Sequence, residues 1–176
     1  MDERKSNAYH RLFMEYGKML TLFLQLGIPT ANLPVDANLT PWIEKIPSGV
    51  YFGYASLRLP STSSEVNGSG FTVYPMVMSI GYNPFYKNTV RSAEVHILHK
   101  FDSDFYEAHM RLLILGFIRE EKDYKSLDAL IEDINFDCEV AKNSLARENW
   151  APKKGVVVDG SDVDGKLDVE WLVESL

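Results

Sequence analysis

The apolar and polar positions divide the chain into a strand-rich middle and a helical segment close to its end. Four segments have the apolar density or the two-residue alternation of strands: 50–59, 71–82, 93–101 and 110–119. The last segment is almost continuously apolar, which predicts a strand buried on both faces. Gly53 indicates a bulge or a close backbone approach, and Pro75 indicates an edge, a bulge or a late strand start.

A helix is predicted to follow Ser126, a favourable N-cap residue with acidic side chains after it, near the positive end of the helix dipole. Its apolar positions recur every three or four residues and form one stripe: Leu127, Leu130, Ile131, Ile134, Cys138, Ala141 and Leu145. Several short strands, one long helix and no regular alternation between them predict an antiparallel sheet or a small barrel.

The two ends of the chain are less regular. Within residues 1–25, apolar side chains such as Leu12 and Phe13 recur at roughly helical spacing, which predicts a short amphipathic helix. Residues 148–176 are rich in acidic side chains. We expect them to form a solvated tail, with a short strand or helix around 167–173.

Charge and cysteine content restrict the possible binding partners and the cellular compartment. The net charge of −7 argues against general nucleic-acid binding but not against a nucleotide held by local donors and a metal. The single cysteine, Cys138, excludes an intrachain disulfide and a zinc site made of cysteines. The apolar run 19–26 is too short to cross a membrane. We expect a soluble protein of a reducing compartment, the cytoplasm, with mitochondria as the alternative.

The segment 27–34 (GIPTANLP) contains two prolines that cannot share one helix, because each lacks an N–H and has a fixed φ. Ile28 and Leu33 precede these prolines and therefore favour extended conformations. Thr30 and Asn32 then point the same way, with a hydroxyl oxygen beside an amide oxygen. Such a pair suits a hard cation such as Mg²⁺ that also binds phosphate. The alternative is a proline-bounded entry into a strand with local turn hydrogen bonds.

Glu94 lies near the start of the otherwise apolar strand 93–101, where a carboxylate costs free energy unless it is paired or faces a cleft. It is therefore a candidate functional carboxylate; the alternative is a charge that protects a sheet edge. In a regular strand His96 and His99 lie on opposite faces, so we do not expect them to share a metal. The sequence has no Walker-type glycine-rich motif.

Six segments together resemble the riboflavin kinase family, specifically the monofunctional eukaryotic type. They are 26–34 (LGIPTANLP), 49–56 (GVYFGYAS), 76–89 (MVMSIGYNPFYKNT), 93–106 (AEVHILHKFDSDFY), 115–124 (LGFIREEKDY) and the helix that follows Ser126. The resemblance implies a compact antiparallel Greek-key β-barrel with one long C-terminal helix. It also implies three parts: an atypical segment 1–25, the barrel domain with its helix at 26–147, and the acidic tail 148–176.

The resemblance further implies an activity: transfer of the γ-phosphoryl group of ATP to the ribityl 5′-hydroxyl of riboflavin, giving FMN. Thr30 and Asn32 match the ligands of the Mg²⁺ that accompanies the nucleotide, with Mn²⁺ or Zn²⁺ as alternatives. Glu94 matches the catalytic base. The expected partners are riboflavin or FMN and ATP or ADP, without nucleic acid or membrane, and the expected state is a monomer.

Other positions match contacts to the two substrates. The nucleotide contacts implied are Thr30, Ile97, His99 and Tyr106. The flavin contacts implied are Arg119, Lys122 and Tyr124, in a loop where Glu120 replaces the usual proline. The alternatives are ordinary ones: a core residue at Ile97, a packed aromatic ring at Tyr106, and solvated charges at Arg119 and Lys122.

The chain departs from the family upstream of residue 26. Family members have a first strand and a glycine-rich loop ending in lysine; here Gly17 is the only glycine and Leu24 takes the place of the lysine. Either the N-terminus comes from another start, splice form or gene model, or it refolds, or the protein is catalytically weakened. Three hypotheses follow: a riboflavin kinase, an impaired flavin- or nucleotide-binding relative or incomplete isoform without the phosphate-binding flap, and a purely structural barrel.

Overall fold

The structure is a computed structural model that describes residues 11–14, 30–33, 40–59, 70–82, 91–101 and 108–175. Its longer strands are β3 (Gly49–Arg58), β4 (Thr72–Gly81), β5 (Ser92–Ile97) and β6 (His109–Arg119). Its shorter strands are β1 (Arg11–Met14), β2 (Thr30–Asn32), β7 (Val157–Val158) and β8 (Ser161–Asp162). The helices are α1 (Leu127–Leu145) and the 3₁₀ helix η3 (Glu170–Leu172).

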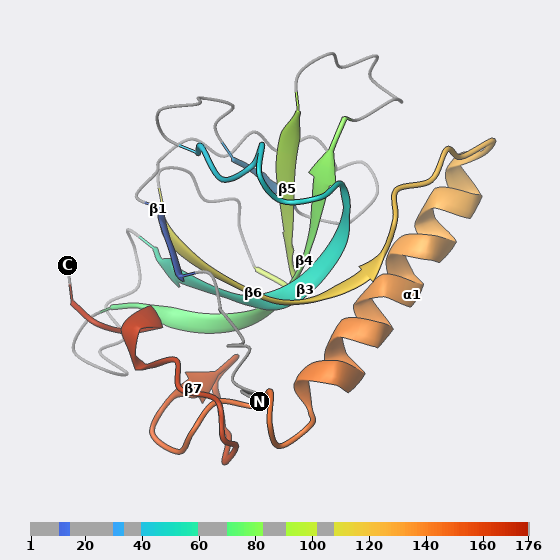
Figure 1. The fold of residues 1–176 in the computed structure, drawn as a ribbon. Coiled ribbons are helices and arrows are strands. Elements are labelled where there is room, and N and C mark those ends of the chain that lie inside the picture. Colours follow the sequence, from blue (N-terminus) through green and yellow to red (C-terminus); the bar gives the residue numbers. More distant parts are fainter. Residues whose placement is uncertain are drawn as a thin grey trace, which may run out of the picture.

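The main strands form one antiparallel, strongly curved sheet in the order β1-β6-β3-β4-β5-β2 (Figure 1). Among the described residues this path ends at β1 and at β2, which pair on one side only, so the sheet is open. The mainly antiparallel β architecture is confirmed, whereas the closed barrel is not found. Both end strands are short, of 4 and 3 residues, and offer little backbone for closure.

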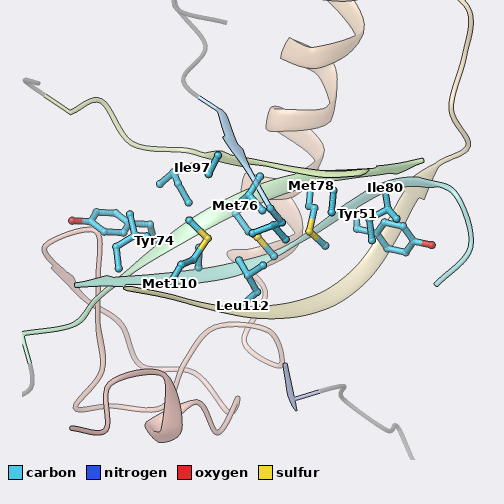
Figure 2. Packing of buried hydrophobic residues seen from close by; sticks show 14 of the residues in the cluster. Tyr51, Tyr74, Met76, Met78, Ile80, Ile97, Met110 and Leu112 are labelled. Carbon is cyan, nitrogen blue, oxygen red and sulfur yellow. The ribbon is translucent and has the colours of Figure 1, made fainter. Parts of the chain in front are cut away.

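The concave side of the sheet holds the first of two apolar clusters. Figure 2 shows its labelled side chains gathered between the curved strands. They come from alternate positions of several strands, as the two-residue period of a strand requires: Ala31, Tyr51, Met76, Met78, Ile80, Val95, Ile97, Met110 and Leu112 are among them. The residues between them therefore lie on the outer face of the sheet.

Glycine and proline determine where two strands bend and end. A side chain at Gly53 would collide with the carbonyl oxygen of Leu113, so the predicted close backbone approach is confirmed. Pro75 lies inside β4, where its carbonyl accepts the N–H of Leu98 at 2.9 Å. Because proline has no N–H to donate in return, the ladder stops there, and β5 ends at Ile97 rather than at residue 101.

The predicted burial of β6 on both faces holds only for its first half. There it lies between β1 and β3, and residues 110–113 are buried. Beyond the end of β1, β3 is the only described strand that pairs with β6, and Phe117 is 51% exposed. The N-terminal segment also differs from expectation, because Arg11–Met14 forms strand β1 and not part of a helix.

The predicted helix is confirmed as α1, and it starts as the sequence indicates: the Ser126 hydroxyl oxygen accepts the N–H of Ala129 at 3.3 Å. Ala141 and Leu145 bury the C-terminal half of the apolar stripe, whereas Leu127 at its start is 45% exposed. Within the described residues, no helix is both long and apolar enough to cross a membrane.

The C-terminal segment is not a solvated tail; it packs against the outer face of the sheet. Its apolar residues join the second cluster: Val156, Val158, Leu167, Val169, Trp171 and Leu172. Buried Arg111 on β6 donates to the carbonyl oxygens of Trp171 at 2.9 Å and Glu174 at 2.7 Å. The Ser56 hydroxyl donates to the carbonyl oxygen of Leu172 at 2.6 Å. The short helix expected around 167–173 is present as η3.

This packing predicts a difference between two leucine truncations. Leu172 is fully buried, so Leu172→Ala should lower the free energy of unfolding by about 2 to 5 kcal/mol through lost contacts and a cavity. Leu127→Ala, at an exposed position, should change it by no more than about 0.5 kcal/mol. Urea unfolding followed by circular dichroism measures both. Equal, small effects would mean that the C-terminal segment is not part of the core.

Candidate active site

The site begins with the register of three neighbouring strands. Strand β5 lies between β2 and β4, and Glu94 is directly opposite Asn32 on one side and Ser79 on the other. Residues opposite each other in antiparallel strands have Cβ atoms about 4.5–5.5 Å apart and point to the same face. In this register Asn32 is paired with Glu94 and Thr30 with His96, and the side chains of Thr30, Glu94 and His96 share a face.

This face is the outer one, because the core residues Ala31 and Val95 occupy the alternate positions. Thr30 is 8% exposed, and its hydroxyl oxygen is buried with no hydrogen-bond partner among the described residues. A buried oxygen in this state costs free energy, which a bound cation would offset. Hydroxyl and amide oxygens are ligands of hard cations such as Mg²⁺, so the residue types at Thr30 and Asn32 fit that ion.

A metal site formed only by protein side chains would differ from one in which the metal also binds the nucleotide. In the described part of the chain, no three or more His, Cys, Asp or Glu side chains gather closely enough to hold a metal ion. His96 shares the outer face with Glu94, whereas His99 lies beyond the end of β5, so the expectation for a regular strand does not apply to it.

A second carboxylate, which sequence reasoning missed, lies in the same region as Glu94. Glu121, in the segment between β6 and α1, places its carboxylate against the backbone of Gly81 at the end of β4. Burial raises the pKa of Glu121, while Arg91, the Ser79 hydroxyl and the Tyr82 N–H oppose that rise. The nearby charge of Glu94 adds to the rise. In the sequence Glu121 is one of several charges in a polar stretch, so no local signal distinguishes it.

Arg91 supplies positive charge in the same region. It is 8% exposed, and its guanidinium donates to the carbonyl oxygens of Glu44 and Ile46 and, at 3.3 Å, to the Ser48 hydroxyl. Arg91 immediately precedes β5. It therefore fixes the loop before β3 to the strand that carries Glu94.

Arg119, at the end of β6, is paired with α1. Its guanidinium donates to both carboxylate oxygens of Asp137, at 2.9, 3.2 and 2.7 Å. Asp137 is only 2% exposed; burial raises its pKa, and the hydrogen bonds and charge of Arg119 oppose that rise. The guanidinium thus forms a structural ion pair with α1, and its remaining nitrogen donates to the carbonyl oxygen of Glu120 at 3.1 Å.

Lys122 and Tyr124 are held by a second aspartate of α1. The Lys122 ammonium and the Tyr124 hydroxyl donate to the same oxygen of Asp133, at 2.7 and 2.9 Å. These bonds keep the pKa of Asp133 below its usual range, so it is ionised at neutral pH. Burial and the bond to Asp133 raise the pKa of Tyr124 to about 12, so its phenol stays protonated and donating.

The predicted nucleotide contacts are only partly brought together. Ile97 is 4% exposed within the core, as its alternative interpretation anticipated. His99 stacks with Tyr74 and Phe101 at centroid distances of 4.9 and 4.6 Å, and its Nδ1 lies 2.5 Å from a carboxylate oxygen of Asp159. This cluster is at the end of β5 opposite to that of Glu94. Tyr106 and the side chain of Asn32 lie outside the described residues.

Comparison with known proteins identifies the class of enzyme. A family model described as "Flavokinase: Riboflavin kinase" matches residues 16–145. The riboflavin kinase of Pyricularia oryzae is 62% identical over 156 residues, covering 85% of this chain and 78% of that protein. The riboflavin kinase of Chaetomium globosum is 58% identical over 187 residues, covering 85% and 79%. Each is a phosphotransferase that acts on a small molecule.

The chain belongs to the riboflavin kinase family, and it phosphorylates riboflavin to FMN with ATP. Both of these relatives are fungal. The crystal structure of riboflavin kinase from Trypanosoma brucei is 28% identical and superposes with a TM-score of 0.54, covering 70% of this chain and 74% of that chain. The family and the activity expected from the sequence are confirmed.

The buried ion pair predicts an asymmetric effect on stability. Asp137→Ala leaves Arg119 half-buried without its partner and should cost about 3 kcal/mol in free energy of unfolding. Arg119→Ala in the Asp137→Ala background should cost far less than it does alone, because the pair is already broken. Glu139→Ala, at a 68% exposed carboxylate of the same helix, is the control and should cost below about 0.5 kcal/mol. Additive losses in the double variant would contradict the pairing.

Proposed function

We propose that Thr30, Asn32 and Glu94 form the phosphoryl-transfer centre of this riboflavin kinase, with Thr30 and Asn32 as metal ligands and Glu94 as general base. The observation that carries this proposal is the register of β2 against β5, which aligns Asn32 with Glu94 and leaves the buried Thr30 hydroxyl oxygen unpaired on the same face. Those are the groups that a metal-assisted transfer to a hydroxyl requires.

In the proposed mechanism Glu94 accepts the proton of the ribityl 5′-hydroxyl as its oxygen attacks the γ-phosphorus of ATP. The new P–O bond forms while the bond from the γ-phosphorus to the bridging oxygen breaks, and ADP leaves with that electron pair. Mg²⁺ bound to the nucleotide and to Thr30 and Asn32 would neutralise charge on the phosphates, and Mn²⁺ or Zn²⁺ are the alternatives. Positioning and charge neutralisation contribute more to this reaction than the base.

We assign the riboflavin side of the site to the segment 119–125. Lys122 and Tyr124 lie on it, and an aromatic face and a cation suit a flat isoalloxazine ring with polar edges. Arg119 is bound to Asp137, so its proposed contribution is to hold the segment in place. We assign His99 to the nucleotide, because its ring already stacks with aromatic neighbours. Ile97 would support this region from the core.

The second candidate function is a flavin- or nucleotide-binding relative with impaired catalysis. The observation in its favour is Leu24 in place of the lysine of the phosphate-binding loop. An isobutyl group cannot contact phosphate as an ammonium does. Residues 15–29, which include Leu24, lie outside the described part of the chain. A measurement of kinase activity therefore has to test whether this N-terminal segment supports catalysis. Binding of riboflavin without any phosphorylation would favour this second function.

Glu94→Gln should separate catalysis from binding. The amide keeps the size of the side chain but cannot accept the proton, so kcat should fall about 10²- to 10⁴-fold. Riboflavin affinity should change little, as measured by quenching of flavin fluorescence. Glu139→Gln makes the same chemical change at an exposed site and should leave kcat unaltered. Full turnover by Glu94→Gln would refute its role as the base.

Thr30→Val should weaken the dependence on metal, because it replaces the hydroxyl by a methyl group of similar size. The Mg²⁺ concentration for half-maximal rate should rise about tenfold or more. Thr30→Ser restores the hydroxyl and should restore most of the wild-type metal dependence. A titration of Mg²⁺ at saturating ATP and riboflavin measures this. If valine and serine behave alike, the hydroxyl is not a metal ligand.

A further inference from the structure

Glu121 is in an unusual position for a carboxylate. It comes from the polar segment after β6, yet its side chain turns toward the end of β4 and is only partly exposed. A Cβ atom at Gly81 would overlap all three atoms of the Glu121 carboxyl group. The absence of a side chain at residue 81 is therefore what allows the carboxylate to lie there.

Two donors hold the carboxylate at this place. The Ser79 hydroxyl and the backbone N–H of Tyr82 both donate to it, and the positive charge of Arg91 is nearby. Ser79 is the direct cross-strand neighbour of Glu94. Glu121 is thus attached to β4 at the residue that adjoins the proposed base.

The other side of the same segment is attached to α1. Lys122 and Tyr124 share Asp133, and Arg119 forms its ion pair with Asp137. The side chains of the segment therefore point in two directions: Glu121 toward the sheet, and the other three toward the helix. Glu121 is the described side chain by which the segment 119–125 contacts the strand next to Glu94.

We infer that Glu121 is a positioning residue for riboflavin: it fastens the segment 119–125 to β4 and so sets where the flavin ring lies relative to Glu94. This inference rests on the proposed assignment of that segment to the flavin and of Glu94 to the base. A segment that is already fixed loses less conformational freedom when the flavin binds, which favours affinity. It also holds the 5′-hydroxyl within reach of the base, which favours turnover.

The test compares Glu121→Ala, Glu121→Gln and Glu139→Gln. Glu121→Ala should raise KM for riboflavin about threefold to tenfold and lower kcat, while KM for ATP stays unchanged. Glu121→Gln keeps an acceptor oxygen for Ser79 and Tyr82 and should recover part of the loss. Glu139→Gln makes the same chemical change at an exposed carboxylate of α1, outside the segment 119–125, and should behave as wild type. A purely structural role would alter the KM values for both substrates together.

A second variant approaches the contact from the other side. Gly81→Ala should displace the carboxylate and reproduce the kinetic change of Glu121→Ala. In the Glu121→Ala background, where nothing remains to collide, Gly81→Ala should add little. This comparison remains informative if Glu121→Ala lowers stability, because the double variant should then be no worse than the single one.

Failure of this inference is distinguishable from failure of the proposed mechanism. Riboflavin binding without ATP does not require a base, so a weakened fluorescence titration for Glu121→Ala supports the positioning role even if Glu94→Gln retains turnover. Unchanged riboflavin binding and unchanged kcat in both Glu121→Ala and Gly81→Ala would overturn the inference. Loss of kcat in Glu94→Gln would then still support the base.

Discussion

The register of β5 between β2 and β4 is the constraint on which the site depends. It places Asn32, Glu94 and Ser79 in one row across three strands. Because side chains alternate along a strand, a slip of one residue would turn Glu94 into the core and move Val95 outward. The apolar residues on the concave side prevent that slip, since each alternate position of β4 and β5 is buried there. The core thus specifies the position of the proposed catalytic groups.

The outer face of the sheet is joined to the proposed flavin-binding segment by a set of ion pairs and hydrogen bonds. Helix α1 uses Asp133 and Asp137 to hold the segment that follows β6, and Glu121 returns from that segment to β4. A buried carboxylate such as Asp137 destabilises the fold unless it is paired. Arg119 pairs with it by bidentate hydrogen bonds to both carboxylate oxygens. The bonds that stabilise the helix are therefore the ones that order the proposed flavin-binding segment.

Local patterns in the sequence predict the parts of this protein that local physics decides. Two prolines fix the extended run around Thr30 and Asn32, alternation identifies the strands, and Ser126 marks the start of α1. The sequence does not show contacts between distant segments. The C-terminal segment looked acidic and solvated, yet its scattered apolar residues fill the second cluster; Glu121 and Asp137 looked like ordinary charges, because their partners are far away in the chain.

The resemblance to the family supplies the proposed roles of residues that no local pattern could assign, and the pairing of β2 with β5 aligns Asn32 with Glu94. The measurement that tests this account most directly is conversion of riboflavin to FMN by the purified chain with ATP, with and without Mg²⁺, followed by chromatography. The account predicts FMN only when the divalent metal is present. Riboflavin binding without any FMN formation, at every metal and ATP concentration, would contradict it and favour a relative that binds flavin without transferring phosphate.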